Sequence, residues 1–121
     1  MNRHFLSAAL AALAVFTSIA PPAIAHTSVT KTSIVNNSHL ATPPKTFQVT
    51  LDHEASLASV RLTDSAGHER ALEYRPSTDR RSSFALPLPA LEDGSYKIEW
   101  KTVAKDGHVM NGAVSFMVMT H

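Results

Sequence analysis

The chain has 121 residues, and its 11 lysines and arginines nearly balance 10 aspartates and glutamates, so the formal net charge is +1. A charge this close to zero argues against nucleic acid or an anionic membrane as the main partner. The sequence contains no cysteine, so disulfides and thiolate ligands are excluded. A site for a soft metal would therefore have to use histidine or methionine.

The first 25 residues are predicted to be a secretory signal peptide. Arg3 precedes an uncharged apolar run over residues 5–20, and Ala23-Ile24-Ala25 has the small-x-small form of a cleavage site. The apolar run is shorter than the roughly 20 residues that a membrane-spanning helix needs. Cleavage after Ala25 would leave one exported domain, residues 26–121, with His26 at its amino terminus.

Short strands separated by turn residues are predicted along the rest of the chain, with no convincing amphipathic helix. The segments expected to form strands are about 27–35, 46–51, 60–63, 68–74 and 82–88, and two more within 94–118. Such a pattern predicts an all-β fold, a Greek-key immunoglobulin-like β-sandwich of about seven strands. The side chains expected in its core include Phe47, Phe84, Trp100 and Phe116.

The stretch from Gly94 to Val118 is predicted to be a β-hairpin. Apolar residues alternate with charged ones in its first half, and the apolar alternation resumes in its second half; the residues expected to point inward are Tyr96, Ile98, Trp100, Val114, Phe116 and Val118. The turn between the two strands carries Asp106, Gly107 and His108. Because residues i and i+2 of an extended chain point the same way, the carboxylate and the imidazole are expected on one side.

Several segments of the mature chain, in this order, carry a family likeness. They are His26 at the start, Pro43-Pro44-Lys45, Leu86-Pro87-Leu88-Pro89, the segment 94–100, Asp106-Gly107-His108, Gly112 and Phe116-Met117-Val118. With these features the chain resembles the CopC family of periplasmic copper-binding proteins associated with copper resistance. The resemblance implies a periplasmic carrier or buffer of copper in copper homeostasis, without enzymatic activity. It also implies that any membrane contact is made through a partner, such as an inner-membrane copper transport protein.

The resemblance implies a copper(II) site formed by His26, Asp106 and His108. The α-amine and imidazole of an amino-terminal histidine can chelate one ion, and the other two side chains would add a nitrogen and an oxygen. Some family members carry a methionine-rich loop that binds copper(I), but here the mature chain has only Met110, Met117 and Met119, expected to pack or to lie at an edge. The resemblance therefore does not support a copper(I) site, and whether copper(I) is bound at all stays open.

The remaining histidines and two other functions stay open as alternatives. His53 is either a further ligand, a hydrogen-bond partner of a ligand, or simply exposed, whereas His39, His68 and His121 are expected at the surface. An amino-terminal histidine chelate on a β-sandwich also fits a copper-dependent oxidative enzyme of the monooxygenase type. A structural module that docks on a membrane copper transporter is the third alternative.

Overall fold

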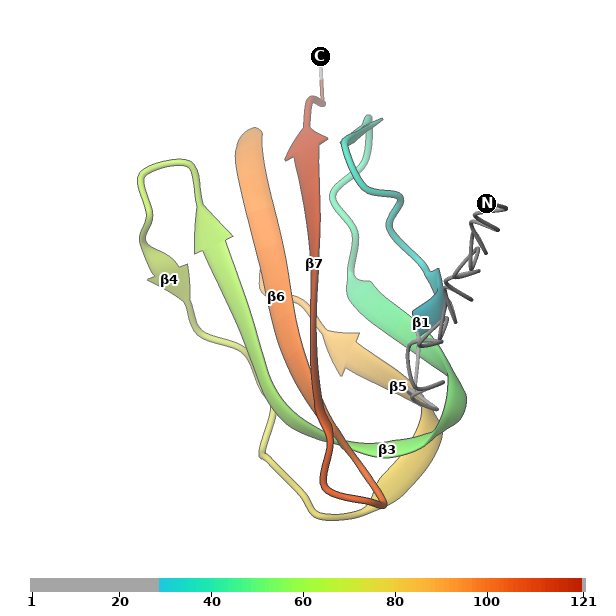
Figure 1. Cartoon of the computed structure of the whole chain (residues 1–121). Coiled ribbons are helices and arrows are strands. Elements are labelled where there is room, and N and C mark those ends of the chain that lie inside the picture. Colours follow the sequence, from blue (N-terminus) through green and yellow to red (C-terminus); the bar gives the residue numbers. More distant parts are fainter. Residues whose placement is uncertain (1–28, 121) are drawn as a thin grey trace, which may run out of the picture.

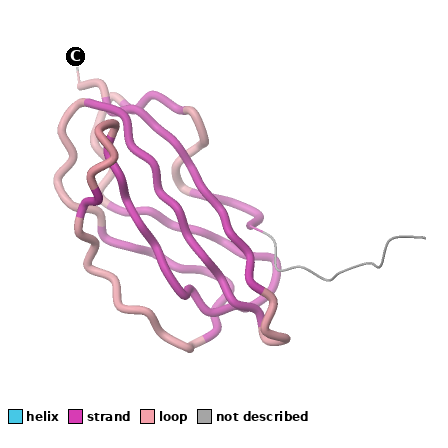
Figure 2. The backbone as a smooth tube through the Cα atoms, turned by 60° about the vertical axis from the view of Figure 1, so that its left-hand side comes forward, coloured by secondary structure: helices cyan, strands magenta, loops and turns pink. Residues whose placement is uncertain are grey.

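The computed structural model describes residues 29–120, all of them in strands, turns and loops (Figure 2). The strands are β1 (Val29–Thr32), β2 (Ser38–Leu40), β3 (Thr46–Asp64), β4 (Glu69–Arg70), β5 (Arg80–Pro87), β6 (Gly94–Ala104) and β7 (Val109–Val118). No helix that could span a membrane occurs in this range. The predicted signal peptide, His26 and His121 lie outside the described residues.

The long strand β3 belongs to both layers of the sandwich. Its first half pairs with β1 and β5, and its second half pairs with β4 and β6. The change occurs at Asp52, His53 and Glu54, three consecutive exposed residues where the register shifts. A shift of this kind bends a strand and increases its twist. The seven strands therefore form one continuous sheet that curls over itself, as Figure 1 shows.

Strands β6 and β7 form the predicted hairpin, and β2 extends the sheet beyond it. The antiparallel register between β6 and β7 runs without interruption from Gly94 opposite Val118 to Val103 opposite Val109. Strand β2 lies parallel to the end of β7. The β6–β7 turn and the β3–β4 turn therefore lie at opposite ends of the molecule (Figure 1).

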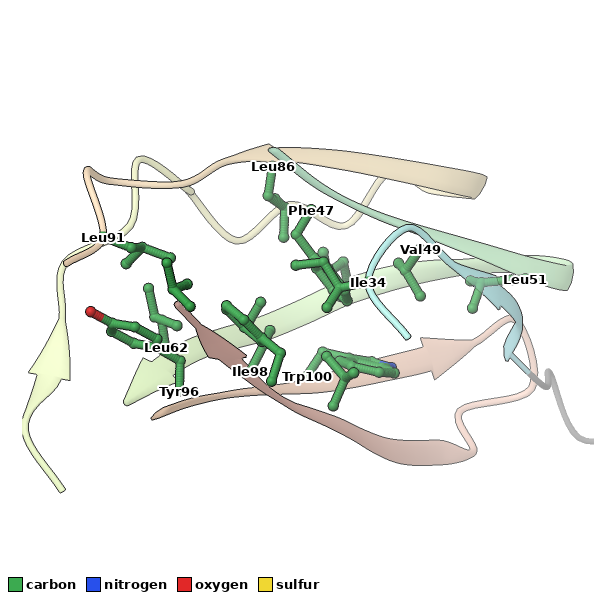
Figure 3. Close-up of a cluster of buried hydrophobic side chains, with 14 of the residues drawn as sticks. Ile34, Phe47, Val49, Leu51, Leu62, Leu86, Leu91, Tyr96, Ile98 and Trp100 are labelled. Carbon is green, nitrogen blue, oxygen red and sulfur yellow. The ribbon is translucent and has the colours of Figure 1, made fainter. Parts of the chain in front are cut away.

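The core lies between the two layers (Figure 3). Apolar residues alternate along the long strands β3, β6 and β7, so each of these contributes one face, and all six inward positions predicted in the hairpin are buried. Phe47 from β3 packs against Trp100 from β6 with ring centroids 5.5 Å apart. Phe84 is only partly buried and packs on the edge of this cluster.

Two contacts on β6 show how closely its aromatic side chains are fitted. The indole of Trp100 covers Gly112 on β7, where a Cβ atom would lie 2.3 Å from Cε2 of the ring. Only glycine leaves room for the indole at this position. The hydroxyl of Tyr96 donates to the carbonyl of Glu92, 2.7 Å away. A tyrosine bonded to the backbone a few residues upstream is typical of immunoglobulin-like sandwiches.

The fold class is confirmed, whereas several strand boundaries differ from those predicted. The segments 46–51 and 60–63 belong to one strand, β3. The strand expected over 27–35 ends at Thr32, and the chain then turns through Asn37 (φ 62°) into β2, which was not predicted. The strand expected over 68–74 is reduced to Glu69–Arg70, because Leu72 and Tyr74 pack on the core from a loop.

Candidate metal centre

The turn between β6 and β7 has a compact geometry that depends on Gly107. The N–H of Gly107 donates to the carbonyl of Ala104, and the N–H of Ala104 donates to the carbonyl of His108, both at 2.9 Å. Gly107 has φ of 89°, a left-handed conformation that suits glycine. This is the three-residue hairpin loop in which a type I turn is followed by a left-handed residue. His108 therefore stands at the end of the hairpin ladder.

Asp106 and His108 meet in this turn. Oδ1 of Asp106 accepts the backbone N–H of His108 at 3.1 Å, and Oδ2 lies 2.6 Å from Nδ1 of the imidazole. Both side chains are about half exposed, 53% for Asp106 and 55% for His108. The expectation that the two groups share one side is thus met, but for another reason. The backbone here is a tight turn rather than an extended strand, and the carboxylate folds back over Gly107.

The hydrogen bonds at Asp106 keep its carboxylate ionised. The backbone N–H of His108, and then its imidazole, lower the pKa of Asp106 below the usual range. The hydrogen bond of 2.6 Å between Asp106 Oδ2 and His108 Nδ1 holds the two groups side by side. A metal ion that bound both atoms would take the place of the shared proton. An anionic oxygen and an imidazole, both open to solvent, therefore fit a borderline cation such as copper(II).

The same backbone turn occurs a second time, at residues 64–68. The carboxylate in this second turn belongs to Asp64, and its hydrogen-bond partners differ from those of Asp106. The N–H of Gly67 donates to the carbonyl of Asp64, and the N–H of Asp64 donates to the carbonyl of His68, both at 3.0 Å. The carboxylate of Asp64 accepts N–H groups of Ala66 and His68 and lies 3.4 Å from Nε of Arg70. His68 Nδ1 stays 4.0 Å away. A neighbouring arginine disfavours a second cation at this turn.

The other described histidines do not join Asp106 and His108. His39, His53 and His68 are exposed, as predicted for His39 and His68. Within residues 29–120, no three histidine, aspartate or glutamate side chains gather closely enough to hold a metal ion. The described part of the chain thus brings together two of the three predicted ligands. The third, His26, lies outside the described residues, so the predicted ligand set stays a prediction.

The start of the described chain lies at the same end of the molecule as the Asp106–His108 pair. Val29 on β1 is opposite Leu51 on β3, just before the bend of β3. Just after that bend, Ala55 is opposite Ala104, where the β6–β7 turn begins. Val29 also lines a hollow together with Met110, two residues after His108. This proximity depends on the bend of β3, which has no clear signal in the sequence.

Comparison with known proteins gives a consistent result. The family model of the CopC domain matches residues 29–119. The copper resistance protein C of Xanthomonas campestris pv. juglandis is 30% identical over 104 residues, covering 79% of this chain and 82% of that protein. The copper resistance protein C of Escherichia coli is 26% identical over 128 residues, covering 98% of this chain and 97% of that protein.

Solved structures show the same fold. The crystal structure of CopC from Methylosinus trichosporium OB3b has a TM-score of 0.64 and 23% sequence identity, covering 77% of this chain and 93% of that one. The crystal structure of PcoC, described as a methionine-rich copper resistance protein from Escherichia coli, has a TM-score of 0.62 and 23% identity. That match covers 78% of this chain and all of the PcoC chain.

Proposed function

The chain belongs to the CopC domain family, and from this membership we propose that it binds copper and acts in copper resistance. The observation that carries the proposal is the Asp106–His108 pair, in which an ionised carboxylate and an imidazole lie 2.6 Å apart in a solvent-exposed turn. Neither group is needed for the core, and together they present two donors to one ion.

The complete site, in this proposal, adds the amino-terminal histidine. Cleavage after Ala25 would give His26 a free α-amine, and its amine and imidazole would close a chelate ring on the ion. Val29 lies at the same end of the molecule as the turn, and the three residues back to His26 can span roughly 11 Å. That reach supports a site in which His26, Asp106 and His108 bind one ion.

The donor set favours copper(II) as the ion at rest. Three nitrogens and one carboxylate oxygen suit the tetragonal geometry of copper(II), and the negative carboxylate offsets part of its charge. With half-exposed ligands the ion could also be released to another protein. We therefore propose a carrier or buffer in the periplasm, reached through the predicted signal peptide of residues 1–25, that hands copper to an inner-membrane transport protein.

The oxidative-enzyme alternative receives no support from the described surface. All six aromatic side chains within residues 29–120 are buried or partly buried. An enzyme that acts on a polymer would be expected to expose aromatic side chains around its copper. The carboxylate of Asp106, when bound to the ion, would also occupy a coordination position that oxygen activation requires.

The assignment can be tested by replacing His108 and comparing it with a matched histidine. The protein beginning at His26 is titrated with copper(II) against a chromogenic chelator of known affinity. His108→Ala should weaken copper(II) binding at least about tenfold, or 1.4 kcal/mol, because one equatorial nitrogen is lost. His68→Ala is the control, since His68 occupies the same position in a turn of the same type at the other end of the molecule.

The possible outcomes distinguish a wrong assignment of the site from a wrong assignment of the function. Equal losses in the two variants, or no loss in His108→Ala, would mean that the β6–β7 turn is not the site. Failure of the unaltered protein to bind copper at all would refute the proposed function. Nitrogen hyperfine structure in the electron paramagnetic resonance spectrum, reduced in His108→Ala only, would support the assigned ligand.

A further inference from the structure

The edge of β7 that faces away from β6 is covered only toward the end of the strand. Strand β2 pairs with Phe116–Val118, and no strand within residues 29–120 pairs with this edge before Phe116. Just ahead of β2, the N–H of Ser115 donates to Oδ1 of Asn36 at 2.8 Å, and the carbonyl of Ser115 accepts the N–H of Asn37 at 2.6 Å. The covered part of the edge therefore begins at Ser115.

The backbone groups of the preceding stretch can be assigned from Ser115. Both of its backbone groups point away from β6, and alternate residues in an antiparallel ladder direct their N–H and C=O groups to the same side. The β6–β7 register is uninterrupted, so Val109, Asn111 and Ala113 also direct these groups away from β6. All three residues are exposed. The stretch Val109–Val114 is called the uncovered edge below.

The uncovered edge has none of the features that usually protect a strand edge. Natural proteins keep such edges short, bulged or charged, place proline on them, or cover them with another segment. Residues Val109–Val114 contain no charged residue and no proline, and they belong to a regular ladder. An edge of this composition is therefore expected to be covered by another segment of protein.

A hollow of about 320 Å³ lies beside the uncovered edge, on the open side of the sandwich. It is lined by the end of β1 on one side and by β7 on the other; the lining residues are Val29, Thr32, Asn36, Trp100, Thr102 and the stretch Met110–Val114. Strands β1 and β7 belong to different layers and are not paired with each other. The hollow is thus a gap between the beginning of β1 and the uncovered edge.

The described chain begins at this hollow, directly after residues 26–28. The β1–β3 register shifts between Val29 and Lys31, so β1 has one extra residue there. Such a bulge bends the strand that carries it. Followed backward from Val29, which is opposite Leu51, the chain heads toward the bend of β3 and the β6–β7 turn. The residues that precede Val29 are thus attached beside the beginning of the uncovered edge.

We propose that residues 26–28 of the exported protein add to the uncovered edge as a short strand, with Asn111 as their main hydrogen-bond partner. The segment and β7 both run away from the β6–β7 turn, so the pairing is parallel, as it is for β2. Three residues span about 10 Å, which matches the length of Val109–Asn111. A second copy of the chain, or a separate partner, would compete with residues 26–28 for this place, which favours the chain's own segment.

The added strand holds His26 beside the β6–β7 turn before any ion binds. A ligand that is already held in place loses less conformational freedom on binding, so the affinity for the ion is higher. This role at the copper site rests on the proposed function, whereas the added strand itself does not.

Amide hydrogen exchange in the copper-free protein tests the strand without any metal. A protein that begins at His26 is compared with one that begins at Val29. The N–H of Asn111 should exchange at least about tenfold more slowly in the longer protein, because the added strand accepts it. The N–H of Ser115 is the control, since Asn36 accepts it in both proteins.

Two results would overturn the inference. The first is equal exchange of the Asn111 N–H in the two proteins, which would mean that residues 26–28 do not cover the edge. The second is protection of Asn111 that increases with protein concentration, which would assign the uncovered edge to a second copy of the chain.

The role of the strand at the copper site is tested by Asn111→Pro, with Ala113→Pro as the matched control. Both N–H groups point away from β6, so each proline leaves the β6–β7 ladder intact, and only Asn111 lies within reach of residues 26–28. Asn111→Pro should weaken copper(II) binding at least about fivefold relative to Ala113→Pro, because His26 is no longer held beside the turn. Chelator competition measures both affinities, and near-ultraviolet circular dichroism verifies the fold.

Equal copper(II) affinities in the two proline variants would overturn the role of the strand in holding His26. Failure of the unaltered protein to bind copper(II) would refute the proposed function instead. The exchange of the Asn111 N–H depends on neither the metal nor the proline variants, so it still decides whether the strand exists.

Discussion

Gly107 and Gly67 are equivalent residues in two equivalent turns, and only one of them supports the candidate metal centre. Both have left-handed backbones, with φ of 89° and 80°, and a Cβ atom added to either would meet nothing within 4 Å. Their replacement by alanine therefore costs backbone strain alone, about 1 kcal/mol each. Any difference between the two variants must come from what each turn carries.

We expect Gly107→Ala and Gly67→Ala to lower the free energy of unfolding by similar amounts and to differ in copper binding. Straining Gly107 displaces the Asp106 carboxylate from the His108 imidazole, so copper(II) affinity should fall about tenfold, or 1.4 kcal/mol. Urea unfolding and chelator competition measure the two effects. A comparable fall in copper affinity for Gly67→Ala would mean that the loss reflects general destabilisation and not the turn.

The turn that carries Asp106 and His108 could be predicted from the sequence, but the way in which these two side chains meet could not. The Asp-Gly-His triplet predicts a turn with two metal donors, and the structure has both donors in contact. The contact arises because a left-handed Gly107 folds the chain back, a detail that alternation along an extended strand does not describe. His53 also could not be decided from the sequence, since its position depends on the irregular bend of β3.

An exposed group of ion pairs joins the strands β3 and β6 on the outer face of the sheet. Arg61 and Glu99 are opposite each other, with their charged atoms 2.8 Å apart, and Lys97 lies 2.9 Å from the same carboxylate. Hydrogen bonds from Arg61 and then Lys97 lower the pKa of Glu99 from 4.5 to about 2. Opposite charges that face each other across strands stabilise a sheet modestly.

The pKa of Glu99 predicts how its contribution to stability changes with pH. Because the pKa is lower in the folded state than in the unfolded state, ionised Glu99 stabilises the fold above about pH 4.5. The contribution is lost as the pH falls through about 2. In Glu99→Gln, the free energy of unfolding should be lower at neutral pH and should decline less between these two values.

Chemical unfolding at a series of pH values measures this effect, and salt should reduce it because the group is exposed. Glu73→Gln, at an exposed position outside β3 and β6, is the control. If the two variants had the same pH profile, the ion-pair group would not contribute to stability.

The segments that form strands were easier to predict from the sequence than whether two such segments belong to one continuous strand. Alternation at Phe47, Val49 and Leu51, and again near Leu62, indicates two strands, and both segments are strand. They form one 19-residue strand because the polar residues between them occupy a bend rather than a loop. Strand β2 could not be predicted, since three residues give no periodicity and its pairing with β7 joins distant parts of the chain.

At the scale of the whole molecule, the two ends of the sandwich have different roles. One end has the β3–β4 turn, where Asp64 is satisfied by backbone N–H groups and Arg70. The other end brings together the β6–β7 turn, the bend of β3 and the beginning of β1. Loops and chain ends gather at the poles of a sandwich, where a rigid core positions them for binding.

This arrangement makes the amino terminus the most sensitive point of the proposed site. If His26 chelates copper through its α-amine and imidazole, one extra residue before it should abolish the chelate, because the amine becomes an amide. Every side chain, and the fold of residues 29–120, would be unchanged. We expect copper(II) affinity to fall at least about tenfold, or 1.4 kcal/mol, in a protein with one alanine added before His26.

The added alanine and a His26→Ala variant should give different losses. The first removes the amine and keeps an imidazole, whereas the second keeps an amine and removes the imidazole. Chelator competition measures both, and mass spectrometry of the exported protein establishes where it begins. Equal copper(II) affinity in the extended and mature proteins would refute the amino-terminal chelate. The ion held by Asp106 and His108 would then need a donor from another part of the chain. His53 would be the first to replace, because it lies two residues before Ala55, which is opposite Ala104 at the start of the turn.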